Sequence, residues 1–180
     1  SDAANWTLDG SVAPLYINPG GEVPSPGDRV FVTNGRTITM DVNNASVDYM
    51  EVIGRLDLAT TSGHNFTTIN GKGIIRMQGA GTPAVDNFPA GITTGPNGFA
   101  DRINGGTLEL YGSGLTLDQP RTFKDVIVNM TGNTDEAVLL ADYNINGDLR
   151  VDRGVFQINN DDGPTGNTNP LHTVVLGDVE

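Results

Sequence analysis

The chain has 180 residues, of which 22 are acidic and 10 are basic, and its formal net charge is −12. This balance excludes the clusters of Lys and Arg on which binding to nucleic acid or to an anionic membrane surface depends. Because Cys is absent, the chain has neither disulfide bonds nor thiolate metal sites. No apolar run is long enough to cross a bilayer, so we expect no direct membrane insertion.

Short runs of alternating apolar and polar residues follow one another along the chain. Each run is bounded by Gly, Asn, Asp or Pro, the residues that favour turns. The abundance of Gly and Pro disfavours helices, and apolar residues nowhere keep a helical spacing over three turns. The sequence therefore predicts an all-β protein. The predicted strands are Val30–Val32, Thr37–Met40, Val47–Ile53, Leu56–Leu58, Ile74–Met77, Thr107–Tyr111, Val126–Val128, Leu149–Val151 and Val155–Ile158.

Four of these strands share one pattern, in which an isoleucine and a glycine-containing turn precede an apolar-charged-apolar triplet. Leu56 and Ile75 begin two successive triplets and are 19 residues apart. A repeat of about 20 residues is typical of a solenoid, so we predict a parallel β-helix, or β-solenoid. A β-sandwich with coincidental repetition is the alternative. Longer intervals separate the triplets that begin at Leu108 and Leu149, and we expect an excursion before the first and an extra turn before the second.

Stacking of the triplets would place their charged middle residues in one outward column. The column would run Asp57, Arg76, Glu109, Arg150, with an extra rung interrupting it between the last two. Opposite charges on neighbouring strands, about 4.8 Å apart, favour this register. The flanking residues would point inward as a stacked core, with one column formed by Leu56, Ile75, Leu108 and Leu149 and another by Leu58, Met77, Leu110 and Val151.

We expect a single β-solenoid domain over residues 1–180, and we expect it to be a fragment of a longer repetitive protein. The second expectation rests on the apolar alternation Thr173–Leu176 near the last residue. The segment Gly79–Ala100 is rich in Gly, Pro and Thr and predicts a loop excursion. Such a segment either caps one side of the solenoid or carries function.

Several short motifs follow one another in a particular order along the chain. They are Trp6, Val23–Val32, Asn34–Asp41, Met50–Leu56, Phe88–Gly91, Gly106–Tyr111 and Gly147–Leu149. Their order resembles the opening of the eight-glycine domain, and it is also similar to repeats of the large surface adhesins that gliding and related Bacteroidota export by type IX secretion. The resemblance implies a right-handed parallel β-helix, secretion to the bacterial cell surface and a role in cell adhesion or gliding motility, and it carries over no catalytic residue.

Two segments carry oxygen ligands of the kind that calcium prefers. Asp142–Asp148 matches the start of a calcium loop, but Arg153 stands where the bidentate glutamate belongs, which favours an ordinary strand turn. Asn159, Asp161 and Asp162 form the second candidate, for which a solvated loop is the alternative. We expect no cofactor, and we favour the second segment if calcium binds. His64 and His172 lie far apart in sequence, and we interpret both as turn or surface residues.

Parallel β-helices include enzymes that cleave polysaccharides, so catalysis has to be weighed. The candidate residues are Asp57, Arg76, Glu109, Asp118 and Arg150, but opposite charges in a column are more simply structural. We therefore expect a non-catalytic module for cell-surface structure and adhesion, whose partners are a surface polysaccharide or other cell-surface component and neighbouring repeats of the same protein. The alternative is a carbohydrate-binding or polysaccharide-processing β-helix domain.

Overall fold

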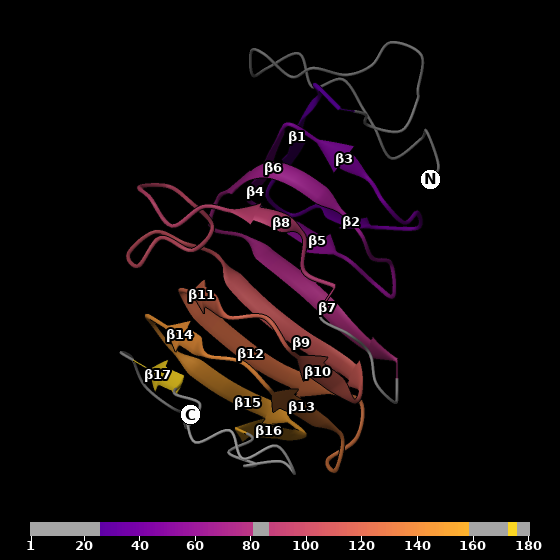
Figure 1. Ribbon diagram of the computed structural model, residues 1–180, viewed down its shortest axis with the longest axis vertical. Coiled ribbons are helices and arrows are strands. Elements are labelled where there is room, and N and C mark those ends of the chain that lie inside the picture. Colours follow the sequence, from indigo (N-terminus) through magenta and orange to yellow (C-terminus); the bar gives the residue numbers. More distant parts are fainter. Residues whose placement is uncertain (1–25, 81–86, 159–172, 176–180) are drawn as a thin grey trace.

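A computed structural model describes residues 26–80, 87–158 and 173–175, in which every regular element is a strand (Figure 1). Gly, Asn and Asp separate the strands, and apolar residues take every second position within them, so that they lie on one face, as a half-buried strand requires. The strands are β1 (Arg29–Val32), β2 (Thr37–Thr39), β3 (Ser46–Val47), β4 (Tyr49–Val52), β5 (Arg55–Asp57), β6 (Asn65–Asn70), β7 (Ile74–Ala80), β8 (Ala90–Ile92), β9 (Thr107–Ser113), β10 (Leu115–Leu117), β11 (Arg121–Phe123), β12 (Asp125–Met130), β13 (Glu136–Leu139), β14 (Tyr143–Ile145), β15 (Leu149–Arg153), β16 (Val155–Ile158) and β17 (Thr173–Val175).

All pairs of these strands are parallel, and strands that pair belong to successive turns of the chain. The central sheet has six strands in the order β15-β12-β9-β7-β5-β2, one from each turn, which we call rungs one to six from β2 to β15. Strands β1, β4, β6, β3 and β8 form a second sheet, and two three-stranded sheets, β10-β13-β16 and β11-β14-β17, complete the later rungs. The protein is therefore a parallel β-helix, as predicted, and the sandwich alternative is wrong.

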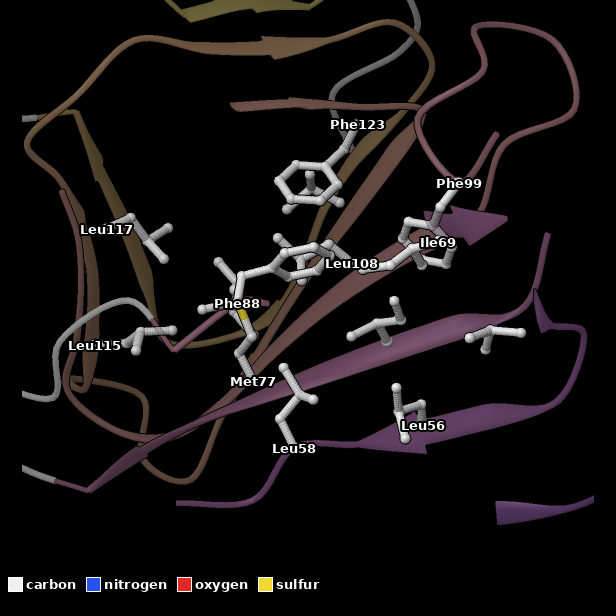
Figure 2. Packing of buried hydrophobic residues seen from close by; sticks show 14 of the residues in the cluster. Leu56, Leu58, Ile69, Met77, Phe88, Phe99, Leu108, Leu115, Leu117 and Phe123 are labelled. Atoms are coloured by element: carbon white, nitrogen blue, oxygen red, sulfur yellow. The ribbon is translucent and has the colours of Figure 1, made fainter. Parts of the chain in front are cut away.

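Stacked apolar columns form the core of the solenoid, and their register confirms the predicted triplets (Figure 2). Leu56 pairs with Ile75, Ile75 with Leu108, Leu108 with Val126 and Val126 with Leu149. Strand β12, which carries Val126, is the extra turn expected between the last two triplets. The second column is also confirmed, with Val128 between Leu110 and Val151.

Only part of the segment Gly79–Ala100 is irregular. Gly79 and Ala80 end β7, and β8 adds a strand to the second sheet by pairing with β6. Phe88 and Phe99 are buried in the core, with their ring centroids 6.4 Å apart, and Phe99 lies against Gly106, where an added Cβ would come within 2.2 Å of the ring. The described part of the segment therefore fills the core of the solenoid rather than only covering it.

The isoleucines that precede the triplets do not occupy equivalent positions. Ile69 and Ile145 are fully buried at strand ends, whereas Ile103 lies in a turn and is 77% exposed. The Asn-Gly steps also differ, because a left-handed backbone occurs at Gly71 but not at Gly105 or Gly147. At Gly71 a Cβ would lie 2.2 Å from the carbonyl oxygen of Val52 on the preceding rung. The repeated pattern therefore predicts which strands stack on one another, but it does not predict the conformation of the turns that precede them.

Leu108→Ala tests the stacked core. Leu108 is fully buried between Ile75 and Val126, so we expect its truncation to lower the free energy of unfolding by roughly 2–5 kcal/mol, measured by urea denaturation. The matched control is Ile103→Ala, which removes a similar side chain from an exposed turn and should change stability by less than about 0.5 kcal/mol. Equal effects of the two substitutions would contradict the placement of the core.

Candidate functional site

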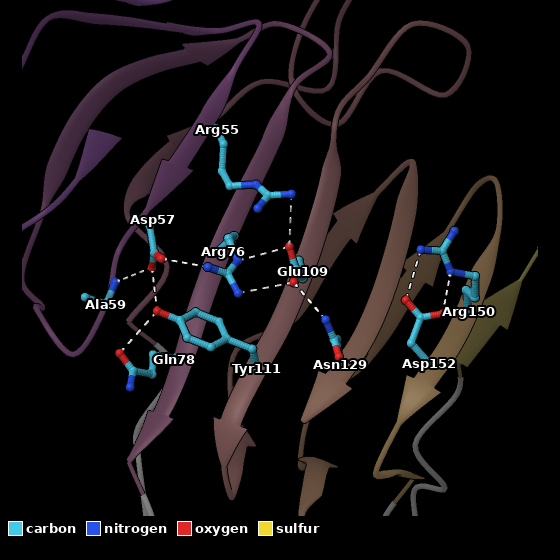
Figure 3. Close-up of polar contacts among 10 residues, drawn as sticks. All are labelled: Arg55, Asp57, Ala59, Arg76, Gln78, Glu109, Tyr111, Asn129, Arg150 and Asp152. Atoms are coloured by element: carbon cyan, nitrogen blue, oxygen red, sulfur yellow. Dashed lines mark hydrogen bonds and ion pairs between the residues drawn. The ribbon is translucent and has the colours of Figure 1, made fainter. Parts of the chain in front are cut away.

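Three charged side chains meet on the outward face of the central sheet (Figure 3). Asp57 on β5, Arg76 on β7 and Glu109 on β9 are register partners. They point outward because the apolar residues that flank each of them point into the core. Arg76 Nη1 lies 2.9 Å from Asp57 Oδ2, and its Nε and Nη2 lie 3.0 and 3.3 Å from the two carboxylate oxygens of Glu109. We call these three residues the charge ladder. One guanidinium thus bridges two carboxylates across three rungs.

Tyr111 covers the charge ladder from the side. Its ring centroid lies 3.9 Å from Arg76 Cζ, and its hydroxyl donates a hydrogen bond to Asp57 Oδ1 over 2.7 Å. Burial, followed by the hydrogen bond and negative charge of Asp57, raises the pKa of the Tyr111 hydroxyl well above its ordinary value. The hydroxyl therefore stays protonated and remains a donor to Asp57.

Further donors saturate the two carboxylates. Asp57 also accepts the backbone N–H of Ala59 over 2.9 Å. Glu109 accepts a hydrogen bond from Asn129 Nδ2 over 3.3 Å and lies 3.9 Å from Arg55 Nη2. Asp57 and Glu109 are consequently only 7% and 6% exposed, although both stand on the outer face of the sheet. Arg55, Arg76, Asp57 and Glu109 sum to zero charge, which leaves no excess charge to attract an ionic ligand.

The structure brings together three of the five catalytic candidates. Ile127 pairs with both Glu109 and Arg150, which confirms the expected interruption of the column. Arg150 instead contacts Asp152, with 2.8 Å between Nε and Oδ1, in an exposed pair. Asp118 follows β10 in a different sheet and is exposed. A glycosidase needs two carboxylates that can reach the substrate, and in the charge ladder both are committed to Arg76.

Sequence reasoning missed Tyr111, and with it Asn129 and Arg55. The signal for Tyr111 was present, because it stands two residues after Glu109 on one strand and must therefore share its face. Asn129 is two residues after Ile127 on the next rung, and its role depends on the register between β9 and β12. That register could be deduced only once the extra rung had been placed.

Of the two candidate calcium segments, the structure describes only the first, Asp142–Asp148. Residues Tyr143–Ile145 of the first segment form β14, in register with β11, and both Tyr143 and Ile145 point into the core. The backbone N–H of Asp148 donates to Asp125 Oδ1 over 2.9 Å, so this segment is a strand and a turn. Asn159, Asp161 and Asp162 lie outside the described residues. Over residues 26–80, 87–158 and 173–175, no three His, Cys, Asp or Glu side chains gather as a metal site would need.

The interpretation of His64 as a turn or surface residue is wrong. His64 is 4% exposed and stacks on Phe66, with ring centroids 5.6 Å apart. Thr61 donates its single hydroxyl proton to the Leu58 carbonyl, so its oxygen must accept from His64 Nε2, 2.9 Å away. Nδ1 is then the unprotonated nitrogen, and it is buried without a hydrogen-bond partner. Burial accordingly lowers the pKa of His64. His172 lies outside the described residues.

Comparison of the chain with family models, with curated proteins and with solved structures found no match. In the described part of the chain, none of the elements is a helix that could span a membrane. The parallel β-helix is thus established by the strand pairing alone. Because one fold serves many functions, the function has to be argued from the surface of the solenoid.

Arg76→Met tests whether the charge ladder holds the rungs together. Loss of the guanidinium leaves two nearly buried carboxylates without the positive charge that they share, and we expect the free energy of unfolding to fall by on the order of 3 kcal/mol. Adding Asp57→Asn and Glu109→Gln to the variant should restore most of the loss. Arg150→Met is the matched control, because it breaks an exposed pair and should cost about 1 kcal/mol or less. Equal losses in the two single variants would contradict a structural role.

His64 predicts a pH dependence of stability. Since its pKa is lower in the folded than in the unfolded protein, the unfolded chain takes up the proton first as the pH falls below about 6.5. The contribution of neutral His64 to stability is therefore complete above that pH and is lost as the pH falls toward the folded value. We expect the melting temperature of His64→Gln to depend less on pH between 7.5 and 5 than that of the wild type. If His172→Gln removed the dependence instead, the assignment to His64 would be wrong.

Proposed function

We propose that the protein is a non-catalytic structural and adhesive module, secreted to the bacterial cell surface. The observation that carries the proposal is the charge ladder, in which Asp57, Arg76 and Glu109 are each already bound by a charged group of a neighbouring rung. Such a cluster is held in place by its own contacts. It suits a solenoid that displays its turns and loops at fixed positions.

A polysaccharide-processing function is the alternative, since the candidate carboxylates do come together. General base catalysis requires a carboxylate oxygen within hydrogen-bond reach of the substrate. Asp57 receives donors from Arg76, Tyr111 and Ala59, and Glu109 receives the other two guanidinium nitrogens of Arg76, one on each of its oxygens. A substrate would have to break these bonds before either residue could act. The geometry therefore supports adhesion over catalysis.

The partners that we propose are a surface polysaccharide or other cell-surface component and neighbouring repeats of the same protein. The resemblance to exported adhesin repeats of Bacteroidota supports this context, including type IX secretion and gliding motility. The loop between β8 and β9, residues 93–106, supports it from the structure. Asp101 accepts backbone hydrogen bonds from Asn97, Ile103 and Asn104, which fixes an exposed turn in one shape and reduces the entropy lost on contact.

Beads coated with the chain test adhesion and catalysis in one experiment. The beads are washed over layers of purified bacterial surface polysaccharide under flow, and the eluate is assayed for new reducing ends and for unsaturated uronate. We expect beads coated with folded protein to be retained more than beads coated with urea-unfolded protein, and we expect no product.

Two outcomes would overturn the proposal. Product that disappears with Glu109→Gln would establish the enzymatic alternative. Equal release of folded and unfolded coats from every polysaccharide and from whole-cell envelope layers would remove the adhesive function.

A further inference from the structure

Five asparagine-glycine steps lie in the described part of the chain. Asparagine is one of the thermolabile residues of proteins, because the backbone nitrogen of the next residue can attack its side-chain amide. A following glycine favours this attack, since it has no Cβ to hinder the approach. The contacts of the glycine nitrogen therefore decide which step reacts in the folded protein. The five steps are Asn34-Gly35, Asn70-Gly71, Asn97-Gly98, Asn104-Gly105 and Asn146-Gly147.

The glycine nitrogen is engaged in a hydrogen bond at four of the five steps. A nitrogen held in this way has to give up its hydrogen bond before it can turn toward the asparagine side chain. Three of these glycines, Gly71, Gly98 and Gly105, are also buried. The N–H of Gly71 donates to the Asn97 carbonyl over 3.1 Å, that of Gly98 to Gly95 over 2.8 Å, that of Gly105 to Asp101 over 2.9 Å and that of Gly147 to Lys124 over 2.6 Å.

The step Asn34-Gly35 differs from the other four. It forms the tip of the turn between β1 and β2, which the Arg36 N–H closes by donating to the Thr33 carbonyl over 3.1 Å. Both Asn34 and Gly35 are exposed, and among the described residues the Gly35 N–H has no hydrogen-bond acceptor. A Cβ added to Gly35 would meet none of their atoms within 4 Å. Nothing in the described structure thus holds the Gly35 nitrogen away from Asn34.

We propose that Asn34 is a site of spontaneous modification, at which the folded chain converts asparagine into a mixture of aspartate and isoaspartate. The Gly35 nitrogen loses its proton and bonds to Asn34 Cγ, while the bond from Cγ to Nδ2 breaks and Nδ2 leaves with a proton as ammonia. The product is a five-membered succinimide ring. Water then opens the ring at one of its two carbonyl carbons. Opening at Cγ gives aspartate, and opening at the backbone carbonyl carbon of residue 34 gives isoaspartate.

The modification changes the charge and the covalent length of one turn. Either product adds one negative charge, so the formal net charge changes from −12 to −13. Isoaspartate also adds a methylene group to the main chain. The turn is attached to rung two, because the Arg36 carbonyl accepts the Arg55 N–H over 2.8 Å, so the change is confined to the exposed tip. The proposal stands whether or not the protein is adhesive.

Ageing of the purified full chain, followed by peptide mass spectrometry, tests the proposal. Each conversion raises the mass of its peptide by about 1 Da. In the folded protein at mildly alkaline pH we expect Asn34 to react at least about tenfold faster than the asparagines of the other four steps, whose glycine amides are protected. In guanidinium-unfolded protein all five should react at similar rates. If the folded protein reacted no faster at Asn34 than at another of the five steps, the proposal would be wrong.

A pair of matched variants assigns the charged product to its residue. Asn34→Gln keeps the amide on a longer side chain that closes a ring much less readily, so we expect the more acidic species seen on anion exchange to form several-fold more slowly. Asn104→Gln makes the same change at an exposed asparagine whose glycine is hydrogen-bonded, and it should leave the rate unchanged. Formation of the acidic species at the wild-type rate in Asn34→Gln would overturn the proposal.

Discussion

Parallel pairing in one fixed register is the constraint on which the rest of the structure depends. Side chains alternate between the two faces of a strand, so a slip of one residue would exchange the core for the surface. In the central sheet such a slip would turn Asp57 and Glu109 inward and expose Leu56 and Leu108. The stacked apolar columns therefore fix the register, and the register in turn places every outward group.

The charge ladder depends on that register and also reinforces it. Asp57, Arg76 and Glu109 meet only when three rungs are aligned, and Tyr111 shields them only because it shares a strand and a face with Glu109. Removing such groups from water costs free energy that their attraction largely offsets, so their contribution is greater to specificity than to stability. These contacts hold the charge ladder in place on the outer face. This is the physical basis on which we propose display and adhesion, rather than catalysis, for the solenoid.

The core columns could be predicted from the sequence because each apolar-charged-apolar triplet follows the two-residue period of a strand. The interval between the triplets at Leu108 and Leu149 is long enough for two turns, and Val126 fills it. Strand β8 could not be predicted from the sequence, since Ala90-Gly91-Ile92 shows no alternation and pairs only because β6 lies beside it. His64 stands next to Gly63, as a turn residue would, and its burial follows from stacking on Phe66. The local sequence pattern thus predicted the strands and their stacking. The conformation of the turns and the position of Tyr111 over the charge ladder depend on contacts between rungs, which the local pattern does not reveal.

Disulfide trapping tests the register most directly, because the chain has no Cys of its own. Thr107 and Asp125 are outward register partners on β9 and β12, and neighbouring parallel strands lie about 4.8 Å apart, within reach of a disulfide. Thr107→Cys combined with Asp125→Cys should oxidise readily to an intramolecular disulfide in the folded protein. Thr107→Cys combined with Ile127→Cys, two residues out of register on the same face, should not. Trapping of the second pair in preference to the first would contradict the register and, with it, the columns and the charge ladder.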